Sequence, residues 1–273
     1  MALQSQQGEI DEDFVFTARL DSVKNLVMLL RAIHFKDHAI IFMTDRGLKV
    51  SVEDSKCVQL SAFIQAEVFE EYTLTEEQVV LKINLAILIE CLNIFGSHNT
   101  ALKMSYRKYG FPLTLLLEED GVVTDCSIRT QEPEEMLDFD IENAHVLNKV
   151  IARADNMKDV LTELDSTSEF VELLLSPDPP YFRLATTGNA GDTKVDISKD
   201  SDMIESFNCT TTTVSRYRYS FIKSLLKPLT VSRKVSVRID DRGLLCLQYM
   251  VPADKYTCFI EYFCTPIAEA DDD

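Results

Sequence analysis

Two stretches of the chain share one order of predicted elements, and this internal repeat constrains the fold more than any single motif does. Residues 18–24 (ARLDSVK) line up with residues 152–158 (ARADNMK). In both copies a strand ends, an aspartate stands at the expected helix start, and a lysine follows in the first helical turn. Each half of the chain then closes with a strand, a short helix and further strands. The sequence therefore predicts four strand–helix–strands units, two in each of two similar domains.

Alternation of apolar and polar residues predicts that short strands make up most of the chain. The predicted strands are residues 14–20, 39–43, 48–52, 58–66, 79–83, 101–106, 113–117, 122–129, 170–175, 181–186, 214–219, 235–239, 244–250 and 256–263. The predicted helices are residues 22–33, 85–95, 157–164 and 221–227. We expect Asp21 to cap the first helix, Asn84 to cap the second, and Pro228 to stop the last.

An acidic segment separates the two predicted domains. Residues 132–144 include Pro133 and several Asp and Glu residues but no Lys or Arg. Proline and like-charge repulsion favour an extended, solvated connector. We therefore predict a first domain at residues 1–131, an acidic connector at residues 132–144 and a second domain at residues 145–273.

The charge balance limits the possible partners. The 273 residues include 27 Lys and Arg against 45 Asp and Glu, which gives a formal net charge of −18. This balance excludes a uniformly basic coat, but a local basic surface depends on where the charges lie. Residues 1–7 lack the features of a secretory signal, and residues 85–95, the longest apolar stretch, are too short to span a bilayer. The seven cysteines form no CxxC motif, so we expect free thiols in a reducing compartment and no membrane association.

Several predicted helices carry basic residues opposite an apolar stripe. These bases are Lys24, Arg31, Lys158, Lys223 and Lys227. One interpretation is that they only solvate exposed helix faces. The other is a shared basic surface that contacts phosphates without reading bases. Aromatic residues are not interleaved with these bases, so stacking on single strands is not predicted.

The sequence gives little support for a catalytic site. His34 and His38 have a metal-ligand spacing only if both lie on one helix, and the predicted helix ends between them. Residues 188–191 (GNAG) lack the following Lys and Ser or Thr of a phosphate-binding loop and predict a turn. The acidic cluster at residues 11–13 leaves open a metal-dependent 3'-5' DNA exonuclease as the alternative function. We expect no enzyme activity, no cofactor and no metal site.

Short segments in both predicted domains carry a family resemblance. They are residues 32–35 (AIHF), 63–66 (FIQA), 131–135 (QEPEE), 137–140 (LDFD), 181–184 (YFRL), 188–191 (GNAG) and 247–250 (LQYM). Together with the repeat and the acidic connector they resemble the DNA sliding clamps, relatives of proliferating cell nuclear antigen. More narrowly, they resemble the Rad-one family of subunits of the nine-one-one checkpoint clamp, over about residues 14–265.

The resemblance implies an α+β sliding-clamp fold of two similar domains, each with two helices packed on antiparallel sheets. It also implies a nuclear heterotrimer with Rad-nine and Hus-one type subunits, which a checkpoint clamp loader places around double-stranded DNA at damage sites. Such a ring supports checkpoint signalling and serves as a platform for repair and signalling proteins. A self-assembling processivity clamp is a further possibility.

In that family the helices line the hole, which implies that the five bases named above face the duplex. Ring closure pairs edge strands of neighbouring subunits, which here correspond to residues 122–129 and 193–198. The implied partner-binding residues are Val123, Cys126, Ile128, Lys194, Val195 and Ile197. The acidic connector departs from that of replicative clamps, so a client pocket near Met136, Leu137 and Phe139 is not carried over.

Overall fold

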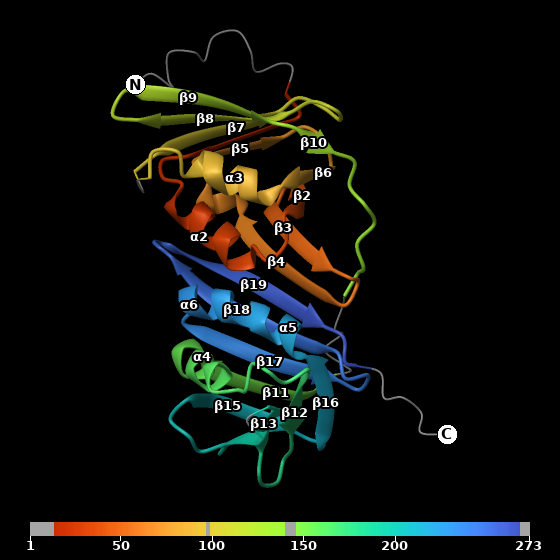
Figure 1. Ribbon diagram of the computed structural model, residues 1–273. Helices are drawn as coiled ribbons and strands as arrows, with labels where there is room; N and C mark the ends of the chain where they lie inside the picture. The colour runs from red at the N-terminus through yellow and green to blue at the C-terminus, as the bar shows by residue number, and fades with distance from the viewer. Residues whose placement is uncertain (1–13, 97–98, 140–145, 190, 268–273) are drawn as a thin grey trace. The chain divides into compact units, whose positions relative to one another are not determined.

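The computed structural model describes residues 14–96, 99–139, 146–189 and 191–267 (Figure 1). The chain divides into two compact units, each built from sheets and a pair of helical segments. Unit one comprises Met1–Glu53, Ser61–Met136 and Ala253–Cys258, and unit two comprises Asp54–Leu60, Leu137–Pro252 and Phe259–Asp273. The sequence-based domain bounds stay a prediction.

Unit one holds one complete antiparallel sheet and part of a second. The first has the order β5–β1–β7–β8–β9, and in the second β10, β6, β2, β3 and β4 are successive neighbours. The bounds are β1 Phe16–Leu20, β2 His38–Thr44, β3 Gly47–Asp54, β4 Val58–Gln65, β5 Glu71–Leu74, β6 Gln78–Asn84, β7 Ala101–Tyr106, β8 Leu113–Glu119, β9 Val122–Ile128 and β10 Thr130–Gln131. A 3-10 turn, η2 at Ala66–Val68, follows β4.

Two contacting helices, α2 (Lys24–Ile33) and α3 (Leu85–Leu92), pack on these sheets. The predicted cap of α3 is confirmed, because the Asn84 side chain accepts a hydrogen bond from the Ile87 amide at 3.0 Å. The predicted cap of α2 is wrong. Ser22 Oγ accepts from the Lys24 amide at 3.3 Å, whereas the Asp21 carboxyl group lies beside that of Glu70, and this neighbour raises the pKa of Glu70.

Unit two repeats this plan. One sheet has the order β14–β13–β12–β16, and strands β19, β18, β17, β11 and β15 are neighbours in that order in the other. The bounds are β11 Val146–Arg153, β12 Phe170–Leu175, β13 Phe182–Gly188, β14 Gly191–Ile197, β15 Ile204–Cys209, β16 Thr213–Arg218, β17 Lys234–Asp240, β18 Leu245–Ala253 and β19 Tyr256–Cys264.

The helical segments of unit two depart from their predicted ends. Helix α4 spans Ala154–Thr162, so Asp155 lies inside its first turn and not at its cap. The last segment is interrupted: α5 (Tyr219–Ile222) leads through the 3-10 turn η4 (Lys223–Leu225) into α6 (Leu226–Val231). Pro228 lies in the first turn of α6, where a missing amide costs no helical hydrogen bond, so it does not stop the helix.

The strand predictions are largely confirmed, but they gave no ranges for β5, β10 and β15 and only the end of β11. Strands β5 and β15 lie at sheet edges, and their residues are exposed or half-exposed. A strand without a buried face shows no apolar alternation in its sequence. No helix within the described ranges is long and apolar enough to cross a membrane.

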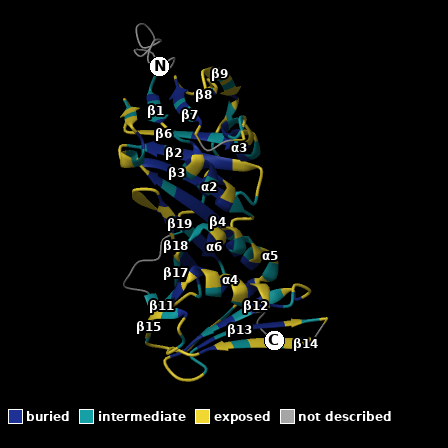
Figure 2. Cartoon of the chain, turned by 90° about the vertical axis from the view of Figure 1, so that its left-hand side faces the viewer, coloured by how far each residue is buried: buried dark blue, intermediate teal, exposed yellow. Residues whose placement is uncertain are grey.

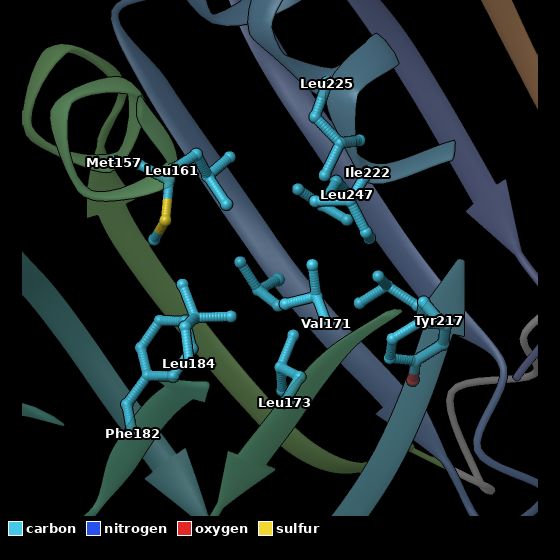
Figure 3. A pocket seen from close by; sticks show the side chains of 12 residues that line it. Met157, Leu161, Val171, Leu173, Phe182, Leu184, Tyr217, Ile222, Leu225 and Leu247 are labelled. Atoms are coloured by element: carbon cyan, nitrogen blue, oxygen red, sulfur yellow. The ribbon is translucent and has the colours of Figure 1, made fainter. Parts of the chain in front are cut away.

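A small apolar cavity of about 20 Å³ lies in the core of unit two (Figure 3). Side chains from α4, from β12 and β13, and from the α5–η4 segment line it, among them Met157, Leu161, Val171, Phe182 and Ile222. A void of this kind stays dry, because apolar walls offer a water molecule no hydrogen bonds.

Filling this cavity is expected to stabilise the protein slightly. The substitution Val171→Ile adds one methylene at a lining position and should raise the free energy of unfolding by up to about 1 kcal/mol. Urea denaturation checks this against Val150→Ile, which adds the same group at a fully buried position that does not line the cavity. Equal destabilisation by both changes would show that the cavity cannot accept the group.

Candidate nucleic-acid and subunit interfaces

In unit one the two predicted DNA-contacting bases lie on α2. Lys24 is its first residue and Arg31 lies in its last turn, and both are exposed. Seven residues are about two helical turns, so both side chains leave the same side of the helix. Neither base has a carboxylate partner among the described residues, which leaves both charges available to a phosphate.

Unit two places its three predicted bases on two helical segments that contact each other. Lys158 lies on α4, Lys223 on η4 and Lys227 on α6, and all three are exposed. Lys158, however, lies between the exposed acidic residues Asp155 and Asp159 on α4. Helix α4 alone is therefore not a basic face, and among the helical segments of unit two the positive charge lies on η4 and α6.

Strands β9 and β14, predicted to meet neighbouring subunits, each lie at the edge of a sheet. β9 pairs only with β8, and β14 pairs only with β13. Most of the β14 side chains are exposed or half-exposed (Figure 2). An unpaired edge offers a row of backbone donors and acceptors to another strand.

The six predicted partner-binding residues divide by burial. Val123 and Lys194 are exposed, and Cys126 and Val195 are half-buried. Ile128 and Ile197, however, are each only 4% exposed. Their side chains are buried within the free chain, so at these two positions the prediction of partner contact applies to the backbone of the edge strand.

Two other sheet edges, those of β16 and β5, are protected. On the outer side of β16, the Ile267 amide donates to the Arg216 carbonyl at 2.7 Å, so the chain itself covers part of this edge. At β5, Glu70 and Glu71 lie 3.5 and 3.7 Å from the Arg19 guanidinium. Charged side chains and self-covering are the usual means of blocking unwanted strand pairing.

Beside β9 lies an apolar surface that the sequence did not reveal. We define the α3–β9 patch as Ile87, Cys91, Ile94, Val122 and Cys126. Ile87, Ile94 and Val122 are 45%, 50% and 57% exposed. Burial, and after it the neighbouring Cys126 thiol, raises the pKa of Cys91 to about 11. Residues 85–95 contain only Glu90 and Asn93 as polar residues, and so apolar a pattern is typical of a largely buried helix, so it did not mark the exposed part of α3.

The acidic connector is held at several points within each unit. In unit one Lys82 forms an ion pair with Glu134, and this contact lowers the pKa of Glu134. In unit two Gln59 donates to the Leu137 carbonyl at 3.1 Å, and the Phe139 ring stacks on Phe263 with centroids 5.9 Å apart. Phe139 also packs against Leu244 and Cys246. Leu137 and Phe139, near which a client pocket was not carried over from replicative clamps, thus contact other parts of their own chain.

The candidate catalytic groups do not assemble. His34 caps the end of α2 and His38 begins β2, so the helical spacing required for shared ligation is absent. Residues 188 and 191 form the last pair of the β13–β14 hairpin, as a turn requires. Within the described ranges no group of three or more His, Cys, Asp or Glu side chains could hold a metal ion. The acidic cluster at residues 11–13 lies outside those ranges.

Comparisons with known proteins identify the family. The family described as "Repair protein Rad1/Rec1/Rad17" matches residues 15–251. The human "Cell cycle checkpoint protein RAD1" is 50% identical over 98% of both chains, and the "DNA repair protein Rad1" of Drosophila melanogaster is 31% identical over 95% of this chain and 96% of its own length. The "DNA repair exonuclease REC1" of Mycosarcoma maydis is 23% identical over 62% of this chain and 48% of its own length. With the two-unit α+β architecture, these matches show that the chain belongs to the Rad1 family of checkpoint and repair proteins.

Proposed function

We propose that the chain is a non-catalytic subunit of a heterotrimeric ring that encircles double-stranded DNA at damage sites in the nucleus. Its ring partners would be Rad-nine and Hus-one type subunits, and a checkpoint clamp loader would place the ring on DNA. There it would support checkpoint signalling and serve as a platform for repair enzymes. The observation that carries the proposal is that each unit presents an edge strand, β9 in unit one and β14 in unit two, that the described residues leave unpaired on its outer side.

The exposed bases support the DNA part of the proposal. Lys24, Arg31, Lys158, Lys223 and Lys227 all lie on helical segments and are exposed. Contacts from such side chains to phosphates release counterions and carry no sequence information. A closed ring needs no tight binding, because topological linkage retains the DNA while weak contacts permit sliding.

Co-expression with Rad-nine and Hus-one type subunits tests the assembly. We expect one complex with the mass of a heterotrimer, whereas this chain expressed alone should run as a monomer. Light scattering after size exclusion measures both masses. A stable homotrimer of this chain alone would instead support the self-assembling processivity clamp and would contradict the proposal.

The alternative function is the metal-dependent 3'-5' DNA exonuclease, which the printed name of the Mycosarcoma relative favours. Incubation of the pure chain with end-labelled DNA and Mg²⁺ or Mn²⁺ separates the two functions. We expect no shortening of the DNA above the buffer control. Cleavage that is lost in the Asp11→Asn and Asp13→Asn double variant would establish the enzyme.

A further inference from the structure

The loop between β7 and β8 exposes two cations and two aromatic rings within residues 107–112. The side chains of Arg107 and Lys108 are exposed, and Tyr109 and Phe111 are 66% and 39% exposed. The loop contains no Asp or Glu. The bases of the helices are not interleaved with aromatic residues, but the bases of this loop are.

The base of the loop is fixed while its tip is open to solvent. The Phe111 amide donates to the Lys108 carbonyl at 3.1 Å, and the Thr130 hydroxyl donates to the Phe111 carbonyl at 2.8 Å. Between them Gly110 has a φ of 82°, which allows the tight turn. The loop therefore lies where β9 leads into β10, at one end of the five-stranded sheet (Figure 1).

The two cations lie against rings and not against carboxylates. The Lys108 ammonium is 5.4 Å from the centre of the Phe111 ring, and the Arg107 guanidinium is 5.2 Å from that of Phe14. Neither cation forms an ion pair with another described residue. In a chain with a net charge of −18, this loop is a local positive site whose charges remain available to an anion.

Exposed rings beside available cations match the chemistry of a single strand of nucleic acid. Unpaired bases stack on aromatic rings, while Lys and Arg contact the intervening phosphates. A duplex offers only the phosphates, because its base faces are stacked internally. Tyr109 is 66% exposed, so its ring is accessible to a stacked base.

We propose that Arg107, Lys108, Tyr109 and Phe111 form a binding site for single-stranded DNA. Bases stack on Tyr109 and Phe111, and the two cations contact the phosphates between them. This site goes beyond the proposed function, in which the helices contact duplex DNA. It would let the same chain recognise an unpaired strand next to the encircled duplex.

Photo-crosslinking of the purified full-length chain tests the site without requiring the ring. The probe is an oligothymidylate that carries one 5-iodouracil, a base that crosslinks to stacked aromatic residues, and mass spectrometry locates the crosslink. We expect crosslinks at Tyr109 or Phe111. The double variant Tyr109→Ser and Phe111→Ser should reduce the crosslink yield at least about tenfold, since stacking of one base is worth roughly 1–3 kcal/mol. An unlabelled single strand should compete, and a duplex of equal length should not.

Two controls keep the outcome unambiguous. The double variant Lys255→Ser and Tyr256→Ser removes an exposed cation and ring from the β18–β19 turn and should leave the crosslink unchanged. The single variant Tyr109→Ser alters only the more exposed ring, and a melting temperature equal to that of the wild type shows that its fold is intact. Unchanged crosslinking in the folded loop variants, or equal competition by duplex, overturns the proposal. Normal strand binding combined with lost co-assembly would make the loop a subunit contact instead.

Discussion

Simultaneous reversal of Lys24, Lys158 and Lys223 to glutamate is expected to remove most of the electrostatic affinity of the assembled ring for DNA. Each lysine is exposed on a helical segment, and each reversal replaces an attraction to phosphate with a repulsion. We expect affinity at low salt to fall by roughly 100-fold or more. The slope of log K against log salt should become shallower by about 3, because three phosphate contacts are lost.

The matched control for this prediction carries the same change in net charge at other places. Lys56, Lys199 and Lys255 are exposed lysines in turns outside the helical segments, and their reversal should leave the salt slope unchanged. Fluorescence anisotropy with a labelled duplex at several salt concentrations measures both triple variants in the assembled ring. Equal losses in the two variants would mean that net charge, and not helix position, governs binding. No loss in the helical variant would remove these residues from the DNA-facing surface.

Local sequence signals predicted the parts of this fold that depend only on residues close in sequence. The alternation that marks β7 and β12 gave both strands with their observed ends, and the Asn84 cap follows from its position before an apolar run. Asp21 does not cap α2, and its carboxyl group lies beside that of Glu70, which is far along the chain. No local pattern contains that contact.

The candidate interface residues could be predicted only where their exposure depends on their own helix or strand and not on how the elements pack together. Helical spacing placed Lys24 and Arg31 on one exposed side of α2. The resemblance implied Ile128 and Ile197 as partner-binding residues, but their burial depends on how each sheet packs, which a resemblance between sequences does not give. The exposure of Ile87 and Ile94 depends in the same way on how much of α3 the sheets cover.

The α3–β9 patch carries the second large prediction. The double variant Ile87→Lys and Ile94→Lys should prevent assembly of the heterotrimer. An exposed apolar surface next to an unpaired edge strand is typical of a subunit contact, and two charges buried there without partners would each cost several kcal/mol. We expect the apparent dissociation constant for the partner that pairs with β9 to rise by at least about 100-fold, equivalent to roughly 3 kcal/mol.

The fold should tolerate these changes, because both isoleucines are about half exposed in the free chain. The matched control is Val214→Lys on β16, which introduces a lysine at a position that is 51% exposed, on an edge partly covered by the chain itself. Co-expression and size exclusion compare the variants, and the melting temperature of each free chain shows that it remains folded. A folded Ile87 and Ile94 variant that still co-elutes with both partners would remove the patch from the interface. Co-elution lost with the Val214 variant would shift the contact to β16. Loss with the patch variant alone would place the neighbouring subunit over α3 and β9 together, because a strand pairing at the β9 edge must also cover the apolar side chains beside it.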